Sequence, residues 1–144
     1  MKHILCAIDL THLESEDKLL RTAADLAKFY DAALSVVTVI PDYGMSIVGS
    51  YFKEGTMKSA VETANVQLHD FVKETLPEFG KVQHIVEVGT AYEMILDAIK
   101  RSQADLVVMG AHKPNLMDKL QGPNSARVSR YAPCSVLVVR PSTA

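Results

Sequence analysis

The chain lacks any long hydrophobic run and any strong charge of one sign. No apolar stretch approaches the roughly 20 residues that a membrane-spanning helix needs. Lys and Arg number 15 and Asp and Glu 17, a formal net charge of −2 with both signs interleaved. Such a surface lacks the basic patch of a nucleic-acid binder. We expect no nucleic-acid partner, no membrane contact and a cytoplasmic location, since the chain begins with a strand-like segment rather than a signal peptide.

Cysteine is scarce. Cys6 and Cys134 are the only two, and both lie within or beside apolar runs, where a free thiol behaves as a small core residue. We therefore expect no disulfide and no redox role. With 48% apolar residues, the 144-residue chain can bury a core without such support. It predicts a single domain over residues 1–144.

Sets of catalytic or metal-binding residues are also missing. Ser125 has no surrounding G-x-S-x-G sequence and no identifiable base partner. The histidines show no ligand spacing, and we expect structural or surface roles for all of them. They are His3, His12, His69, His84 and His112.

Short apolar runs that tolerate β-structure alternate with segments of helical period. The runs are residues 3–8, 33–40, 82–88, 106–109 and 136–139. This alternation predicts right-handed crossovers, and hence a doubly wound α/β domain with a parallel sheet and helices on both faces.

Local signals suggest where helices begin. Thr11 and Glu14 have capping-box spacing at the start of the first helix, with Ser15 as a competing cap. Thr90 and Glu93 have the same spacing before the third helix.

The second expected strand ends at Pro41, which lacks the N–H that a central ladder needs. A connection rich in glycine and apolar residues follows. Residues 43–52 could form a lid, a partner surface or a packed loop, and the sequence does not separate these readings.

Open parallel sheets bind ligands outside the carboxyl ends of their strands, where the strand order reverses. Asp9 and Gly110 end the first and fourth strands, which are the expected neighbours there. Gly122, Asn124 and Ser125 precede a helical stretch, whose free N–H groups favour an anion. We predict a nucleotide phosphate at this edge. Asp9 either contacts that ligand or caps the following turn.

Other doubly wound domains do not fit. A phosphoacceptor receiver needs paired acids after the first strand, but Leu10 follows Asp9 there. A flavodoxin-type phosphate loop needs glycine in the same place, and residues 11–17 contain none. A Walker loop is absent as well.

Five segments together resemble the universal stress protein family over essentially the whole length, and most closely its single-domain bacterial branch. They are IDL (8–10), TVI (38–40), GTAYEMIL (89–96), ADLVVMGAH (104–112) and SVLVVRP (135–141). The resemblance implies a five-stranded sheet of order 3-2-1-4-5 and a homodimer formed through the last strand. It also implies a regulatory role in stress response and, in many members, a site for ATP or another adenine nucleotide.

The resemblance also suggests roles at the adenosine end of the site. Asp9 matches the acid that hydrogen-bonds the ribose, with Ala7 and Ile8 lining the cleft beside it. Val39 matches the residue whose backbone meets the adenine edge.

For the phosphate end, Met109 and Gly110 match the positions that lead to the phosphate loop. Gly122, Asn124 and Ser125 match the groups that hold the terminal phosphates.

The loop departs from the family motif G-2x-G-9x-G-(S/T). Lys113 stands at the second glycine position, the spacing to Gly122 is one residue shorter, and Pro123 replaces the hydroxyl residue. Pro123 removes a backbone donor, whereas Lys113 adds a charge that could neutralise a phosphate and Ser125 could supply a displaced hydroxyl.

Two hypotheses follow. The first is a dimeric regulator that binds ATP, ADP or AMP, with Mg²⁺ as a companion of ATP phosphates. The second is a nucleotide-free dimeric interaction protein. An enzyme is not expected, because no general base is identifiable near the terminal phosphate, although slow ATP hydrolysis or self-phosphorylation stays open. Residues 135–140 would form an apolar edge strand, which a partner strand would cover.

Overall fold

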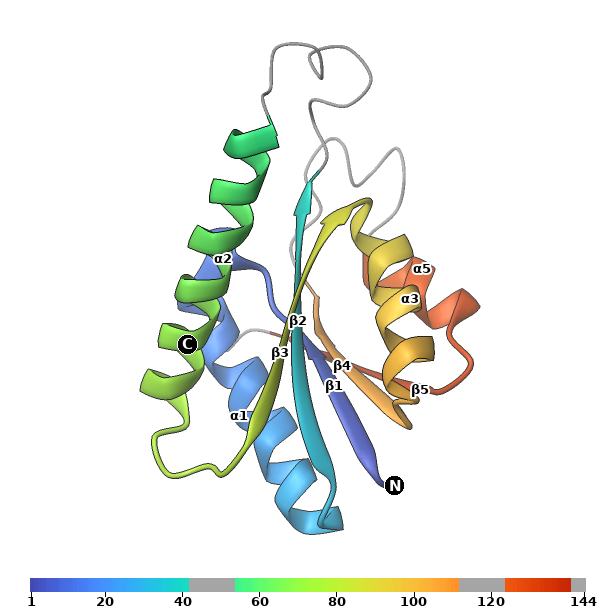
Figure 1. Ribbon diagram of the computed structural model, residues 1–144. Helices are drawn as coiled ribbons and strands as arrows, with labels where there is room; N and C mark the ends of the chain where they lie inside the picture. Colours follow the sequence, from blue (N-terminus) through green and yellow to red (C-terminus); the bar gives the residue numbers. More distant parts are fainter. Residues whose placement is uncertain (42–53, 112–123, 141–144) are drawn as a thin grey trace.

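Five short segments rich in β-branched residues form one parallel sheet in the computed structural model, which describes residues 1–41, 54–111 and 124–140. The strands are β1 (His3–Ala7), β2 (Ala33–Pro41), β3 (Val82–Gly89), β4 (Leu106–Gly110) and β5 (Ser135–Val139). Every neighbouring pair is parallel, and the order is β3-β2-β1-β4-β5. The predicted α/β fold and strand order are confirmed (Figure 1).

The helices cover both faces of this sheet. They are α1 (Leu13–Tyr30), α2 (Glu54–Thr75), α3 (Ala91–Ser102) and α5 (Asn124–Tyr131), with a short 3₁₀ turn η1 (Leu10–His12) between β1 and α1. Figure 1 shows α1 and α2 on one side of the sheet and α3 and α5 on the other. The strand order therefore reverses between β1 and β4, where the chain changes faces.

Because successive strand residues point to opposite faces, the sheet divides the core into two clusters. Ile4 and Cys6 of β1 pack with Leu20 and other residues toward α1 and α2. Leu5 packs with Ile99 and others toward α3 and α5. Each fully buried Leu or Ile stabilises the fold by about 1.5–3 kcal/mol. Packing on both faces thus fixes where the strand ends lie.

The predicted capping boxes are wrong. Asp9, not Thr11, caps the first turn, by accepting a hydrogen bond from the Thr11 N–H. Helix α1 then begins at Leu13 without a side-chain cap, and Thr90 stands at the N-cap of α3 but makes no cap hydrogen bond. An acid that directly follows a strand can satisfy the next backbone donors before the residue at capping-box spacing does.

Strand β2 ends at Pro41, as predicted, with Pro41 as its last residue. Pro41 pairs in register with Gly89 of β3, whereas the pairing of β2 with β1 has already ended at Val37. A residue with only one neighbouring strand can lack its N–H at little cost.

Two other expectations concern cysteine and membranes. Cys6 and Cys134 are both free thiols, as predicted. Within the described residues, no helix is both long enough and apolar enough to span a bilayer.

Candidate functional site

The ladder between β1 and β4 is short. It ends at the Cys6–Val108 pair, and residues 7–9 and 109–111 continue past it without pairing to each other. We call the edge of the sheet between these two segments the β1/β4 crevice. It lies at the carboxyl ends of the strands where the strand order reverses, which is where open α/β sheets bind ligands.

Past this point, β1 stays hydrogen-bonded to β2, and β4 stays hydrogen-bonded to β5. The Ile8 N–H donates to the Val37 carbonyl at 2.8 Å, which extends the β1–β2 pairing. On the other side, the Ala111 N–H donates to the Val139 carbonyl at 3.0 Å, which extends the β4–β5 pairing. The separation of β1 from β4 is therefore built into the backbone of the sheet.

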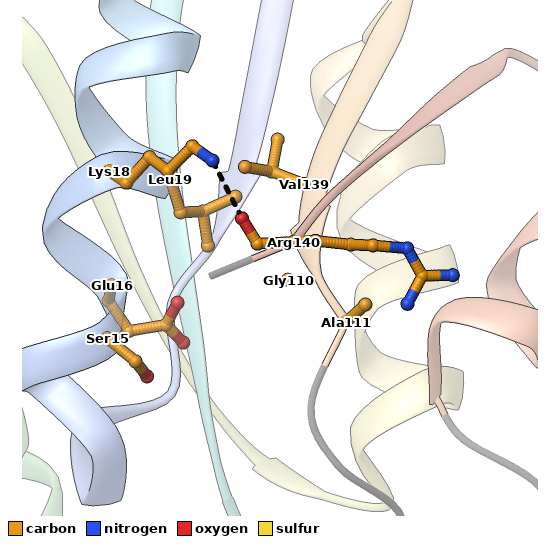
Figure 2. Close-up of a pocket in the computed structure, with 8 residues that line it drawn as sticks. All are labelled: Ser15, Glu16, Lys18, Leu19, Gly110, Ala111, Val139 and Arg140. Atoms are coloured by element: carbon orange, nitrogen blue, oxygen red, sulfur yellow. Dashed lines mark hydrogen bonds between the residues drawn. The ribbon is translucent and has the colours of Figure 1, made fainter. Parts of the chain in front are cut away.

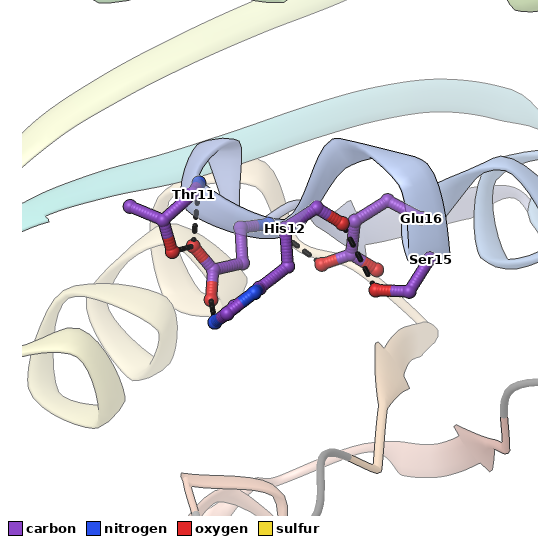
Figure 3. Close-up of polar contacts among 5 residues, drawn as sticks. Thr11, His12, Ser15 and Glu16 are labelled. Atoms are coloured by element: carbon purple, nitrogen blue, oxygen red, sulfur yellow. Dashed lines mark hydrogen bonds and ion pairs between the residues drawn. The ribbon is translucent and has the colours of Figure 1, made fainter.

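Asp9 follows β1 at this crevice and holds the turn after it. Its Oδ1 accepts from the Thr11 N–H at 2.9 Å and from the Thr11 hydroxyl at 2.6 Å. Its Oδ2 lies 4.0 Å from Nε2 of His12. Figure 3 shows these contacts around Thr11 and His12. A carboxylate has about four acceptor positions, so a capping Asp9 keeps capacity for ligand hydroxyls.

The neighbouring predicted residues face different sides of the sheet. Ala7, Val39 and Met109 pack with the cluster under α3 and α5. The Ile8 side chain is instead buried in the cluster under α1 and α2, so only its backbone could contact a ligand in the crevice.

The backbone of Val39 points toward the β1 side of β2. Because groups two residues apart in a strand face the same way, Val39 has the orientation of Val37, whose carbonyl bonds Ile8. The β1 ladder ends at Val37, so the Val39 N–H and carbonyl face the region past the end of β1. A planar heterocycle could form hydrogen bonds there with backbone groups alone.

Asn124 and Ser125 form the first turn of α5, which has no acidic residue in that turn. Val128, fully buried, anchors this helix on the core, and the Arg127 guanidinium lies over the Tyr92 ring at 4.9 Å. The N-terminus of α5 is thus held by packing against α3.

Lys113, Gly122 and Pro123 lie outside the described residues, as does the 43–52 segment. The proposed phosphate loop is therefore described only at its two ends, Gly110 and Asn124.

Glu16 is a residue that the sequence patterns did not single out. It is only 1% exposed, and its Oε1 accepts the Asp9 N–H at 2.8 Å (Figure 3). Burial, and to a lesser degree the charge of Asp9, raise the pKa of Glu16 to about 7, against the lowering effect of the Asp9 N–H. Its helical spacing to the buried Leu19, Leu20 and Ala23 was the available signal, which its charge masked, because glutamate is rarely buried.

A cavity of about 10 Å³ lies beside Glu16. Its lining comes from Ser15, Glu16, Lys18 and Leu19 of α1 and from Gly110, Ala111, Val139 and Arg140 at the ends of β4 and β5. Figure 2 shows the Glu16 carboxylate directed from α1 toward Gly110 and Ala111. This volume holds about one water molecule, so the cavity borders the crevice and is not itself a nucleotide site.

A larger groove of about 370 Å³ lies between the start of α1 and α2. It is lined by Leu13, Glu14, Gln67, Asp70, Phe71 and Glu74. None of these comes from β1 or β4, and its three carboxylates repel an anionic ligand. The crevice is the better candidate for a nucleotide.

Comparison with known proteins decides the family. The model of the universal stress protein family matches residues 1–140. Universal stress protein A homolog 1 of Coxiella burnetii is 31% identical, over 96% of this chain and 95% of its own length. The chain belongs to the universal stress protein family.

Solved structures of the family share its fold. A universal stress protein in complex with cAMP has a TM-score of 0.69 at 18% identity and covers 98% of both chains. The universal stress protein of Archaeoglobus fulgidus in complex with dAMP has a TM-score of 0.67 at 20% identity, covering 96% of this chain and 97% of its own. These two family members bind adenine nucleotides.

No cluster of three or more histidine, cysteine, aspartate or glutamate side chains suited to a metal ion occurs within residues 1–41, 54–111 and 124–140. If Mg²⁺ accompanies ATP in this universal stress protein, these residues provide no all-protein cage for it. Mg²⁺ commonly keeps several waters and binds substrate phosphates with one or two carboxylates.

Proposed function

We propose that this universal stress protein binds an adenine nucleotide, ATP, ADP or AMP, in the β1/β4 crevice and regulates a stress response. The observation that carries the proposal is the separation of β1 from β4 after Cys6 and Val108, with Asp9 at its edge. The complexes of two family members with cAMP and dAMP support the choice of adenine nucleotide.

The adenosine end would rest on β1 and β2. The Asp9 carboxylate accepts hydrogen bonds from ribose hydroxyls, which are charge-assisted and worth about 1.5–3 kcal/mol. Ala7 and the Ile8 backbone lie beside the sugar. The Val39 backbone N–H and carbonyl would meet the adenine edge, which presents both a donor and acceptors.

The phosphate end would rest on β4 and α5. Met109 and Gly110 lead the chain to it, and the N-terminal N–H groups of α5 at Asn124 and Ser125 favour an anion. Lys113 and Gly122 complete this end in the proposal. ATP would bring Mg²⁺ chiefly on its own phosphates.

We propose that the protein regulates by binding the nucleotide without turning it over. We also propose that it assembles as a homodimer. Leu137 and Val138 of the edge strand β5 are 36% and 37% exposed. An apolar edge of this kind invites pairing with a second copy.

Isothermal titration calorimetry with ATP, ADP and AMP tests the function, with GTP as the matched control. We expect saturable one-to-one binding of an adenine nucleotide and much weaker binding of GTP. Absence of binding for all three adenine nucleotides would contradict the proposal and leave the nucleotide-free dimeric interaction protein.

A further inference from the structure

Glu16 is a carboxylate placed where apolar side chains would normally lie. It is buried beside Leu19 and Leu20 at the start of α1, and a buried charge is costly unless it is bonded. Its Oε1 accepts the backbone N–H of Asp9, the residue we propose as the ribose ligand. The carboxylate thus contacts the adenosine end of the site through the backbone.

The same carboxylate faces the end of β4. Gly110 and Ala111 lie across the small cavity from it, at the start of the chain's path toward the phosphate end (Figure 2). Glu16 therefore bonds to Asp9 on one side of the crevice and shares a small cavity with Gly110 and Ala111 on the other.

Within the described residues, ionisable groups near Glu16 come from β1, η1, α1 and the end of β5. Asp9 precedes η1, and the Cys6 thiol lies on β1, where burial first and the charge of Glu16 second raise its pKa. Lys18 and Arg140 line the cavity, and the Lys18 ammonium donates to the Arg140 carbonyl at 3.0 Å. Burial first, against the Asp9 N–H and with the charge of Asp9, raises the pKa of Glu16 to about 7, so that it is about half-protonated at neutral pH.

A nucleotide would change that balance. Its phosphates carry negative charge, and in a partly buried crevice this charge is only weakly screened. Added negative charge near Glu16 disfavours the carboxylate and favours the neutral acid. The neutral acid still has a carbonyl oxygen to accept the Asp9 N–H, so the turn can stay in place.

We propose that Glu16 is a positioning residue whose carboxylate becomes protonated when an anionic nucleotide binds, so that the affinity of the crevice increases as the pH falls through neutrality. This inference rests on the proposed nucleotide site. It adds a proton linkage to that site, so that the fraction of protein with bound nucleotide would depend on pH as well as on nucleotide concentration.

The test compares the ATP dissociation constants of the wild-type protein and Glu16→Gln at pH 6.5 and pH 8.0. Gln keeps the oxygen that accepts the Asp9 N–H but does not titrate. Taking the ratio of the two constants cancels the titration of ATP itself. From pH 6.5 to 8.0 we expect the wild-type constant to rise several-fold relative to the variant, up to about eightfold if Glu16, with a pKa of about 7 in the free protein, stays protonated in the complex. Glu14→Gln, an exposed change in the same turn, should behave as wild type.

A direct titration keeps the inference testable if Glu16→Gln does not fold. ¹³C NMR of the Glu16 carboxyl in the wild-type protein should give a pKa near neutrality without ligand, and a higher pKa with ATP bound. An unshifted or lowered pKa on binding overturns the inference, as does titration in the ordinary glutamate range in the free protein.

The two proposals fail differently. Binding of ATP with a ratio of constants that does not change with pH removes the role of Glu16 and leaves the proposed function intact. No binding of ATP at either pH removes the nucleotide site, and the proton linkage with it.

Discussion

The imidazole of His84 on β3 stacks against that of His69 on α2, with ring centroids 3.6 Å apart and planes inclined by 16°. Nε2 of His84 is buried and has no hydrogen-bond partner within the described residues. Burial, followed by the neighbouring His69, lowers the pKa of His84. Protonation of His84 places charge in the contact between α2 and the sheet, so this contact resists acid poorly.

The first prediction concerns this contact. An unfolded His84 binds its proton at the ordinary pKa of about 6.5, whereas the folded one binds it only at lower pH, so wild-type stability falls as the pH drops below 6.5. His84→Phe keeps a ring to stack and removes the titrating group. In urea unfolding, the free energy of unfolding of the variant minus that of the wild type should be larger at pH 5.5 than at pH 8. Parallel pH profiles for the two proteins would refute this account of the pair.

A second prediction separates the two roles of Asp9. Asp9→Ala removes the cap of η1, which should lower the free energy of unfolding by about 1 kcal/mol. It should also weaken ATP binding about 10- to 100-fold, because a charge-assisted hydrogen bond to ribose is lost.

Thr11→Ala is its matched control. It removes one of the bonds that Asp9 accepts but leaves the carboxylate and the Thr11 N–H in place. Calorimetry should find ATP affinity close to wild type. Equal losses of affinity in the two variants would mean that Asp9 acts only by holding the turn.

The third prediction tests the junction between β3 and α3. Gly89 has φ +148°, and a Cβ there would lie 3.1 Å from Cγ of Met94. Gly89→Ala should lower the free energy of unfolding by about 1–3 kcal/mol, because residues other than glycine rarely adopt this backbone conformation. A Cβ added at Gly80 would have no atom within 4 Å, so Gly80→Ala should change stability by less than about 0.5 kcal/mol. Similar denaturation midpoints for both variants would be inconsistent with strain at Gly89.

The fourth prediction concerns assembly. If β5 pairs with a second copy, Val138→Lys places a charge on the paired edge and should convert a dimer into a monomer in sedimentation velocity at micromolar concentration. Val66→Lys is the control, since Val66 is 59% exposed on α2 and lies away from β5. A monomeric wild-type protein, or a dimer that both variants retain, contradicts pairing through this edge.

Much of the fold could be predicted because the strands are continuous apolar runs. Residues such as Val107 and Val108 are buried on opposite faces, and only a sheet covered on both sides buries both. The helix starts were predicted less well. Capping-box spacing at Thr11 competes with the carboxylate of Asp9, and a pattern along the chain does not reveal which bond forms.

The site could be predicted only in part for a similar reason. Asp9 and Gly110 were placed at one edge by topology alone. Glu16 was missed because a charged residue is rarely buried, although its spacing places it on the buried stripe of α1, and the stack of His69 on His84 joins residues fifteen positions apart on different elements. Such contacts follow from tertiary packing, which periodicity does not report.

The central claim is that the β1/β4 crevice holds an adenine nucleotide. The most direct measurement is to denature freshly purified protein and identify and quantify any released nucleotide by mass spectrometry, followed by calorimetry with Mg-ATP. The account predicts an adenine nucleotide released in near-stoichiometric amount or, from protein purified empty, saturable binding of Mg-ATP. Neither released nucleotide nor a calorimetric response would contradict it.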